Sequence, residues 1–516
     1  MTNKPLFLRL PDSGHHALQA SSDSGPNGTP SSLMPAELCI SSFAQACAAR
    51  RAMRQRPASS SSSAPPNGEL PLLLLNCRVL DPEAGEYLPG LQRVLIRGGV
   101  IAEVRPMGAA GQEQQEGEGV QEEQSTCMGS AAGAAVTAES ADVVPPSAGS
   151  CSPDVVPAVV ADCGGAVVMP GLCDAHVHCT AATADLAGLM SLPESYVAAK
   201  AAHILGGMLA RGFTTVRDAG GADFGLAQAV EEGLVLGPRL LFTGHALSQT
   251  GGHGDFRGRG EDVCACGAAL RGIGRVCDGD AEVRRAARDE LRRGAHCIKI
   301  MASGGVASPT DRLTNTQFSE GEMRAIVEEA QAAGTYVCAH AYMPDAIRRA
   351  VACGVRSIEH GNYLDAGTAG LMAAKGTFLV PTLVTYQELA RAGTAAGMPQ
   401  ELVGKVGNAV EAGLRSLAVA HTAGVTMCFG SDLLGDLHPA QASEFSLRAR
   451  VLPAAEVLRA ATVNCARLFG MEYSLGRVHP GFRADLLLLQ PGVDPLSDVG
   501  VLAAAGGAAV AAVFKE

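Results

Sequence analysis

The sequence lacks the features that mark several large classes of protein. Basic residues are in deficit: 40 Lys and Arg stand against 52 Asp and Glu, which gives a formal net charge of −12. A general nucleic-acid binder needs a basic face to neutralise phosphates, so we expect no nucleic-acid partner. The longest uncharged apolar stretch, residues 499–514, contains a glycine pair and is shorter than the ~18 residues of a membrane span. We therefore expect no membrane partner either.

The sequence also lacks a disulfide pattern and a dinucleotide-binding turn. Its 16 cysteines are scattered, mostly inside apolar segments, which predicts a reduced, intracellular protein in the cytoplasm. The tightest cluster, Cys264 and Cys266, lies in a Gly-rich loop without the paired C-x-x-C units of zinc motifs. No Gly-x-Gly-x-x-Gly turn follows the first apolar run of the central region, which disfavours a dinucleotide fold.

Composition divides the chain into segments. Residues 1–68 are rich in Ser, Pro and Gly and predict a disordered, low-complexity tail. Four arginines between residues 50 and 56 leave organelle import as an alternative. Residues 69–165 and 471–516 hold short apolar runs separated by turns, which predict one small composite β-sandwich domain built from both terminal segments. An acidic insert at about 108–155 is expected to be a disordered loop within it.

The central segment, residues 166–470, has a different pattern. Eight apolar, β-rich runs alternate with amphipathic helical stretches, and the first run, "AVVMPGLCDAHVH", reads as one strand. This alternation predicts an α/β fold, a (β/α)8 TIM barrel. An open, doubly wound sheet would show the same alternation.

Polar residues stand at or near the ends of these apolar runs. Catalytic groups of a barrel sit at the C-terminal ends of its strands, and a buried charge there needs a partner or a metal. Imidazoles with one or two oxygen donors suit zinc or a related divalent ion. Together they predict a metal site made of His176, His178, Lys299, His340, His360 and Asp432. A seventh polar residue, His245, lies near the end of the third strand, in the run "RLLFTGHAL".

Lys299 carries the most chemical information in this set. In "CIKIMASGG" it alternates with Ile298 and Ile300, so its side chain should point toward the barrel axis. Burying an ammonium there is costly, and a desolvated lysine readily loses its proton. A neutral amine can react with carbon dioxide to give a carbamate, an anion that can bridge two cations.

Several motifs resemble one known family. They are "PGLCDAHVH", "TTVRDAGG", "TGGHGD", "KIMASGGVASPTD", "QFSEGEM", "CAHAYMPDAI", "SIEHGN", "VPTLVTY" and "GSDLLGDLHPAQASEF". The chain resembles the amidohydrolase superfamily, in its imidazolonepropionase-like and Xaa-Pro dipeptidase-like branch, over about residues 70–516 without the acidic insert. The resemblance implies a binuclear centre, with His176, His178 and Asp432 on one ion and His340 and His360 on the other. It also implies that Lys299, carbamylated by carbon dioxide, bridges the two ions. We expect both ions to be Zn²⁺.

The resemblance implies a mechanism as well. A hydroxide between the two metals attacks an amide carbonyl, and Asp432 accepts its proton and passes it to the leaving amine. A neutral donor should steady the oxyanion, and His253, Tyr342 and His245 are candidates. His253 and Tyr342 are expected to contact the substrate, with Tyr386 as a further contact. Arg217 and Asp218 are expected to pair below the site without a catalytic role.

The function predicted from the sequence is hydrolysis of a C–N amide bond in small dipeptide-like or N-acyl amino acid substrates. The alternative within the superfamily is a cyclic amide hydrolase of the imidazolonepropionase kind, or a deaminase. A degenerate barrel kept as a binding scaffold belongs to a different class, and the complete set of six metal-ligand positions argues against it. The expected partner is a small-molecule amide, and a homo-oligomer remains open.

Overall fold

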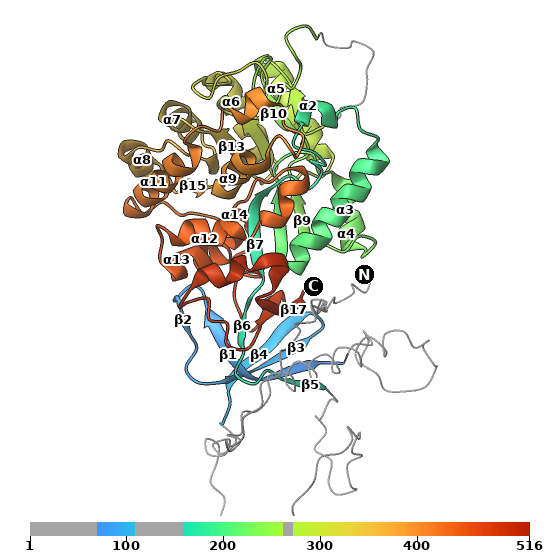
Figure 1. The fold of residues 1–516 in the computed structure, drawn as a ribbon, viewed down its shortest axis with the longest axis vertical. Helices are drawn as coiled ribbons and strands as arrows, with labels where there is room; N and C mark the ends of the chain where they lie inside the picture. Colours follow the sequence, from blue (N-terminus) through green and yellow to red (C-terminus); the bar gives the residue numbers. More distant parts are fainter. Residues whose placement is uncertain (1–69, 109–157, 262–271) are drawn as a thin grey trace, which may run out of the picture.

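A computed structural model describes residues 70–108, 158–261 and 272–516 of the chain (Figure 1). Three predictions fall outside these ranges: the N-terminal tail at residues 1–68, most of the acidic insert, and the Cys264–Cys266 cluster. Within the described residues, no helix is long and apolar enough to cross a membrane.

Strands from both ends of the described chain form one eight-stranded sheet, drawn at the bottom of Figure 1. The C-terminal strands lie beside the N-terminal ones, with Leu487 of β16 opposite Met169 of β6. The pairing of strand β1 changes around Asn76 (φ 54°): β5 pairs with it before this residue and β6 after it, and the register with β3 shifts between Leu74 and Cys77. The strands are β1 (Leu72–Asp81), β2 (Glu86–Tyr87), β3 (Gln92–Arg97), β4 (Val100–Pro106), β5 (Val159–Asp162), β6 (Val167–Pro170), β16 (Leu486–Leu489) and β17 (Val510–Phe514).

The apolar run from Ala166 to His178 is divided, so the prediction of a single strand is wrong. Its first half, β6, pairs with β1 and β16 in the eight-stranded sheet. Its second half, β7 (Leu172–Val177), belongs to a separate parallel sheet. Gly171 separates them where the backbone passes so close to Thr214 that a Cβ would lie 2.1 Å from the Thr214 hydroxyl. Apolar runs of the two kinds look alike in sequence because both strands are buried.

Two parallel sheets occupy the middle of the chain. One has the order β7-β8-β9 and the other β11-β10-β12-β13-β14-β15. Most of their residues are buried, as expected of parallel strands covered on both faces. Beyond β7 the strands are β8 (Phe213–Asp218), β9 (Arg239–Phe242), β10 (Ala246–Ser248), β11 (Gly274–Val276), β12 (Ile298–Met301), β13 (Val337–Ala341), β14 (Ser357–His360) and β15 (Phe378–Val380).

Backbone hydrogen bonds link the two parallel sheets at both ends. The Cys428 N–H donates to Leu379 of β15 at 2.8 Å, and Ala175 of β7 donates to the carbonyl of Phe429 at 2.8 Å. On the other side, the His296 N–H donates to Phe242 of β9 at 2.8 Å, just before β12 begins. The fold is therefore mixed α/β with parallel sheets.

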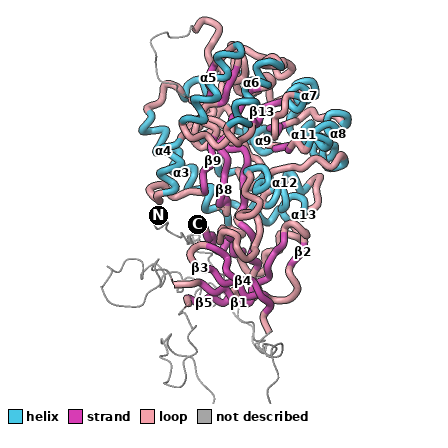
Figure 2. Tube along the Cα trace, turned by 180° about the vertical axis from the view of Figure 1, so that it is seen from behind, coloured by secondary structure: helices cyan, strands magenta, loops and turns pink. Residues whose placement is uncertain are grey.

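Helices surround the parallel strands, as Figures 1 and 2 show from opposite sides. Their ends carry sequence signals: Ser319 and Glu322 form a capping box at α6, and Pro344 opens α7. The longer helices are α3 (Glu194–Ala210), α4 (Phe224–Glu231), α5 (Gly279–Arg292), α6 (Glu320–Ala332), α7 (Pro344–Ala352), α8 (Ala366–Lys375), α9 (Leu383–Ala392) and α11 (Ala409–Thr422). Shorter ones are α2 (Leu186–Leu189), α10 (Gln400–Val403), α12 (Ser443–Ala449), α13 (Ala454–Ala460) and α14 (Val463–Phe469), with 3-10 turns η1 (Gly435–Ala440), η2 (Val499–Ala503) and η3 (Ala505–Gly507).

Candidate metal centre

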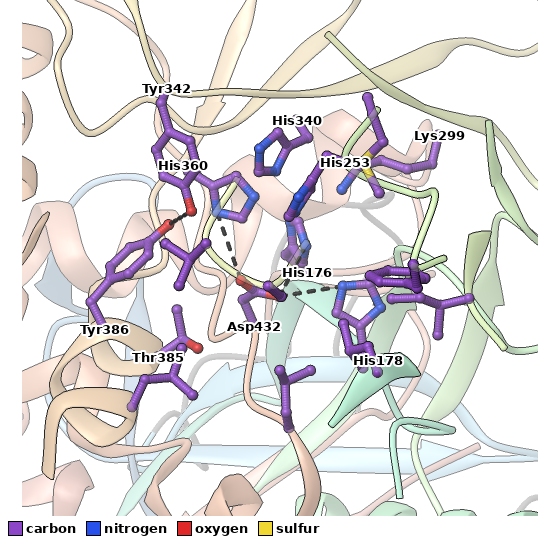
Figure 3. Close-up of a pocket in the computed structure, with 18 residues that line it drawn as sticks. His176, His178, His253, Lys299, His340, Tyr342, His360, Thr385, Tyr386 and Asp432 are labelled. Carbon is purple, nitrogen blue, oxygen red and sulfur yellow. Dashed lines mark hydrogen bonds and ion pairs between the residues drawn. The ribbon is translucent and has the colours of Figure 1, made fainter. Parts of the chain in front are cut away.

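One pocket gathers the predicted site residues at the carboxyl ends of the parallel strands (Figure 3). All six predicted metal ligands line it, from β7, β12, β13, β14 and the segment after Phe429. His253, Tyr342 and Tyr386 line the same pocket. The structure thus brings together nine residues that span about half of the chain, from His176 to Asp432.

His245 lies elsewhere. It lines a second pocket, beside Thr180 and Arg293, and is not among the residues that line the first. Its ring Nδ1 lies 3.4 Å from Glu290 Oε1, and its backbone N–H donates to Glu290 Oε2 at 3.3 Å. The structure therefore gives no geometric support for His245 as a donor to an oxyanion in the first pocket, and its substrate contact stays a prediction.

His176, His178 and Asp432 form the tightest group. Nε2 of His176 and Nε2 of His178 lie 3.4 and 3.3 Å from the same carboxylate oxygen, Asp432 Oδ1. One ligand atom from each of the three lies within 4.8 Å of the others. Two imidazole nitrogens and a carboxylate at this spacing form a donor set suited to a divalent ion.

Hydrogen bonds fix which ring nitrogen each histidine can offer to a metal. His178 Nδ1 donates to the Gly220 carbonyl at 2.9 Å, and His340 Nε2 donates to the Gly304 carbonyl at 3.1 Å. His176 Nδ1 lies 2.8 Å from Glu359 Oε2, and His360 Nδ1 lies 2.8 Å from the Thr382 hydroxyl. Each ring therefore keeps one nitrogen for coordination: Nε2 of His176, His178 and His360, and Nδ1 of His340. Metal-binding histidines in proteins characteristically have their other nitrogen held in this way.

Two of these residues have strained backbones. His360 has φ 72° and Asp432 has φ 53°, in the left-handed region that side chains other than glycine rarely occupy. The Asp432 N–H donates to the His176 carbonyl at 2.8 Å, so the turn aims its carboxylate at the two imidazoles. Such strain is concentrated at functional sites, where the surrounding structure holds it in place.

Lys299 is only 1% exposed and lines the pocket. Within the described residues, its ammonium makes no hydrogen bond or ion pair. An isolated ammonium is costly to bury, so the position suits a chemically modified lysine. This environment fits a carbamate, which would supply two oxygen ligands.

Burial shifts the ionisation of the pocket residues. It lowers the pKa of His340 and of His360 well below 6.5 and that of His253 to about 4, so these rings are neutral at physiological pH. Burial opposes ionisation of Asp432, but the neighbouring His176 and His178 outweigh it and hold the Asp432 pKa well below 3.8. Neutral imidazoles and an ionised carboxylate are the forms that bind metals.

The second layer contains two acids that sequence reasoning missed. Glu359 Oε2 binds His176 and its Oε1 accepts from Arg217 at 2.8 Å, with both side chains fully buried. Arg217 was expected to pair with Asp218, and this is wrong: Asp218 accepts backbone N–H groups from Cys179, Gly220 and Ala222 instead. The sequence did contain a signal for Glu359, because this charged residue stands next to His360 inside the apolar run "SIEHGN".

Asp174 is the second missed acid. It lies in β7, is fully buried, and accepts from the His176 N–H at 3.0 Å and from the Ser431 hydroxyl at 2.6 Å. It therefore ties the histidine strand to the residue before Asp432. The motif "CDAHVH" contained this acid, but its side chain could equally have been a ligand.

The family assignment rests on the amidohydrolase family profile, which matches residues 167–514. The chain belongs to the amidohydrolase family. An ochratoxinase of Aspergillus niger is 34% identical over 348 residues, which are 65% of this chain and 72% of the relative. Family membership and this relative support a hydrolase that acts on amide bonds.

Solved structures agree with this assignment. A prolidase complexed with N-methylphosphonate-L-proline is 46% identical, with a TM-score of 0.75, and the match covers 86% of this chain and 98% of that one. The Aspergillus niger ochratoxinase structure gives a TM-score of 0.68 at 26% identity, and the match covers 86% of this chain and 94% of that one. The structure of a Xaa-Pro dipeptidase with bound methionine is 24% identical, with a TM-score of 0.67, and the match covers 86% of this chain and 100% of that one. At this identity the likeness shows a shared fold alone. The superfamily resemblance in the sequence is thereby confirmed.

Proposed function

We propose that this protein is a binuclear metal hydrolase that cleaves the C–N bond of dipeptide-like or N-acyl amino acid substrates. The observation that carries the proposal is the convergence of Nε2 of His176 and of His178 on one oxygen of Asp432. His340 and His360 lie beside this group, with ring centroids 4.6 Å apart, and Lys299 lines the same pocket. The two sets would each hold one ion, and a carbamate on Lys299 would supply oxygen ligands to them.

The fold proposed for the centre is a (β/α)8 barrel with a β-sandwich beside it. Backbone hydrogen bonds from the Cys428–Phe429 segment to β15 and β7 support closure on one side, and the bond between His296 and β9 supports it on the other. A barrel places the carboxyl ends of all its strands around one mouth, where the six candidate ligands lie.

Two bound divalent ions, zinc by the chemistry of the donors, would activate water as a nucleophile and polarise the substrate carbonyl. Asp432 is placed to take a proton, because its ionised carboxylate faces the pocket and its strained backbone fixes its direction. It then returns that proton to the leaving nitrogen, as general base and general acid in turn. Tyr342 is the proposed donor to the developing oxyanion, since its hydroxyl lies in the pocket 2.8 Å from that of Tyr386.

The rest of the pocket wall supports a small substrate with an apolar part. Beyond the polar groups it is lined by Leu186, Phe256, Ile273, Leu389 and Leu434. Among the described lining residues, Lys299 is the one Lys or Arg side chain. The prolidase relative binds a proline derivative, which is consistent with amino acid amides as the substrate class.

Metal analysis combined with a hydrolysis screen tests the proposal. Purified protein is expected to carry close to two zinc equivalents and to hydrolyse members of a panel of dipeptides and N-acyl amino acids. Chelation should abolish this activity and added zinc should restore it. The control is Asp436→Asn, which changes an exposed acid four residues from Asp432. Full activity in a metal-free preparation would contradict the mechanism, and exclusive activity on cyclic amides would favour the imidazolonepropionase-like alternative.

A further inference from the structure

The loop after β12 folds back tightly beside the candidate metal centre. It contains the glycine pair of "KIMASGGVASPTD", and the Gly304 N–H donates to the Asn315 carbonyl at 3.0 Å. A Cβ on Gly304 would lie 2.0 Å from the carbonyl oxygen of Arg312, so only glycine lets the two halves of the loop approach this closely. Val306 and Ala307 of the loop line the metal pocket, so the position of the loop shapes the pocket wall.

The same loop holds two histidine rings of the pocket. The Gly304 carbonyl accepts from Nε2 of His340 at 3.1 Å, and the Ser308 hydroxyl lies 2.8 Å from Nδ1 of His253. A carbonyl oxygen only accepts hydrogen bonds, so the bond to Gly304 reserves Nδ1 of His340 for a metal. The two rings stack with centroids 4.2 Å apart and lie side by side in Figure 3. A shift of the loop would therefore move both rings.

Lys405 lies between α10 and α11 and fastens this loop. Its Nζ donates to the carbonyls of Gly305, Ser308 and Asp311 at 3.2, 2.6 and 3.0 Å. An ammonium has three protons, one for each carbonyl. All three loop residues are buried, and within the described residues no other hydrogen bond reaches these three oxygens. Since buried carbonyls need a donor, the loop depends on Lys405 for donors that its own backbone does not supply.

Lys405 also balances the charge of Asp311. Its Nζ lies 3.6 Å from Asp311 Oδ1, and the Asp311 side chain is only 2% exposed. The Asp311 carboxylate accepts further hydrogen bonds from the Ser308 hydroxyl, from Gln317 Nε2 at 2.9 Å and from the Gly305 N–H at 3.3 Å. These donors are neutral, and among the described residues Lys405 is the one Lys or Arg side chain within 4.0 Å of this carboxylate. Removing the ammonium would therefore leave a buried charge without its cation, which is costly.

We infer that Lys405 is a positioning residue for the second ion, the one that His340 and His360 would hold, because it fixes the loop whose Gly304 carbonyl orients His340. This inference rests on the proposed centre of two metal ions. Lys405 does not line the metal pocket, so it acts on the ion only through the loop. Its three carbonyl contacts and its charge keep the loop in the shape in which the Gly304 carbonyl reaches the ring.

The first ion, the one proposed on His176 and His178, should depend on Lys405 much less. Glu359 Oε2 holds the His176 ring at 2.8 Å. The Gly220 carbonyl holds the His178 ring at 2.9 Å. Neither partner belongs to the loop after β12. Without the Lys405 contacts, the first ion should therefore stay bound while the second ion is weakened.

Lys405→Met tests the inference, because it removes the ammonium and keeps a side chain of similar length. Metal-free protein is titrated with zinc against a chelator of known zinc affinity. The wild type should bind two equivalents. In Lys405→Met the affinity for the second ion should fall by about 10–100-fold, as is typical when the support of a metal ligand is lost, and the first ion should bind as in the wild type. The matched control is Lys200→Met, since Lys200 also pairs with an acid, Asp436, and has the same side-chain exposure of 24%.

Ring-nitrogen NMR of histidine-labelled protein assigns each zinc step to its ligands. Zinc shifts the signal of the nitrogen that it binds, and the signals of His340 and His178 are identified from His340→Gln and His178→Gln. The zinc concentration is buffered by the chelator at a level that fills both sites of the wild type. At this level Lys405→Met should show a shifted His178 ring and an unshifted His340 ring.

Lys405→Ala guards against a folding defect. The part of the side chain that it removes can be replaced by n-propylammonium, which can reach the site because the Lys405 side chain is 24% exposed. Added n-propylammonium should restore the second ion, whereas n-propanol, which has the same shape without the charge, should not. A second ion bound by Lys405→Met as tightly as by Lys200→Met would overturn the inference. Equal loss of both ions that n-propylammonium does not repair would overturn it too. A wild-type protein that binds fewer than two zinc equivalents would instead count against the proposed function.

Discussion

Glu359 and His176 make a 2.8 Å contact in the fully buried layer beneath the candidate metal centre. The other carboxylate oxygen of Glu359 accepts from Arg217 at 2.8 Å and from the Ser357 hydroxyl at 2.7 Å. The acid therefore sets both the tautomer of the ring and its orientation, so that Nε2 is directed at Asp432.

Glu359→Gln tests this arrangement. Its amide cannot serve His176 and Arg217 as two acceptors at once, so it leaves one partner of a buried charge unsatisfied. We expect metal affinity or kcat/KM to fall by about 10–100-fold and the free energy of unfolding to drop by about 3–5 kcal/mol. Zinc titration and urea unfolding measure the two effects. Glu328→Gln on the exposed side of α6 is the control, and equal behaviour of the two variants would exclude a role for Glu359.

The sequence indicated which candidate ligands lie together better than it indicated the residues that support them. All six predicted ligands meet in one pocket because the chemistry of His, Lys and Asp at the ends of apolar runs is visible locally. The supporting residues Glu359 and Asp174 are different, because they bind partners that lie 183 and 257 residues away in the sequence. Arg217 illustrates the limit: its neighbour in sequence is Asp218, but alternation in β8 turns the two side chains to opposite sides. The division of the run at Gly171 was hidden for a similar reason, since both halves are buried.

Glu290 should make stability sensitive to acid. Burial alone would raise the pKa of Glu290, but His245 and Arg275 outweigh it and hold the pKa below 4.5. The folded state therefore binds this proton less tightly than the unfolded state. Its stabilising contribution is present above pH 4.5 and is lost as the pH falls below it.

Glu290→Gln should therefore cost about 1.5–3 kcal/mol at pH 7. The difference from wild type should shrink as urea unfolding is repeated at pH values below 4.5. Turnover should persist at pH 7, because Glu290 lies outside the metal pocket. If the difference in free energy of unfolding between Glu290→Gln and wild type stayed constant down to acidic pH, it would contradict an ionised Glu290 that pairs with Arg275.

Lys299→Ala tests the bridge. The variant should lose nearly all activity, because no other side chain of the described pocket can replace a bridging carbamate. A short carboxylic acid such as acetate or propionate should restore part of it by occupying the space that the side chain leaves. Lys375→Ala in the last turn of α8 is the control and should behave as wild type. Full activity of Lys299→Ala without additive would remove the lysine from the mechanism.

Tyr386→Phe distinguishes the role of Tyr386 from that of Tyr342. Removing the Tyr386 hydroxyl deprives the Tyr342 hydroxyl of its partner at 2.8 Å but leaves the ring packing intact. Because the proposed role of Tyr342 is donation to the oxyanion, we expect kcat to fall by about 10-fold with little change in KM. Tyr342→Phe should cost more, about 100-fold or above. If Tyr386→Phe raised KM alone, Tyr386 would be a substrate contact rather than a support for Tyr342.

Gly305→Ala tests whether the His253 ring needs its neighbour to be glycine. The added methyl group would lie 2.0 Å from Cε1 and 2.3 Å from Nδ1 of His253, so the ring must move away from Gly305 and lose its alignment with Ser308. Stacking on His340 leaves the ring little freedom on that side, so displacement should carry His340 with it. We expect kcat/KM to fall by about 100-fold, because small misplacements at a catalytic centre have effects of this size. Gly321→Ala in α6 is the matched control, since its methyl group would meet nothing closer than 3.8 Å. A Gly305→Ala variant as active as Gly321→Ala would show that the His253 ring can move without loss of activity, and would argue against its expected contact with the substrate.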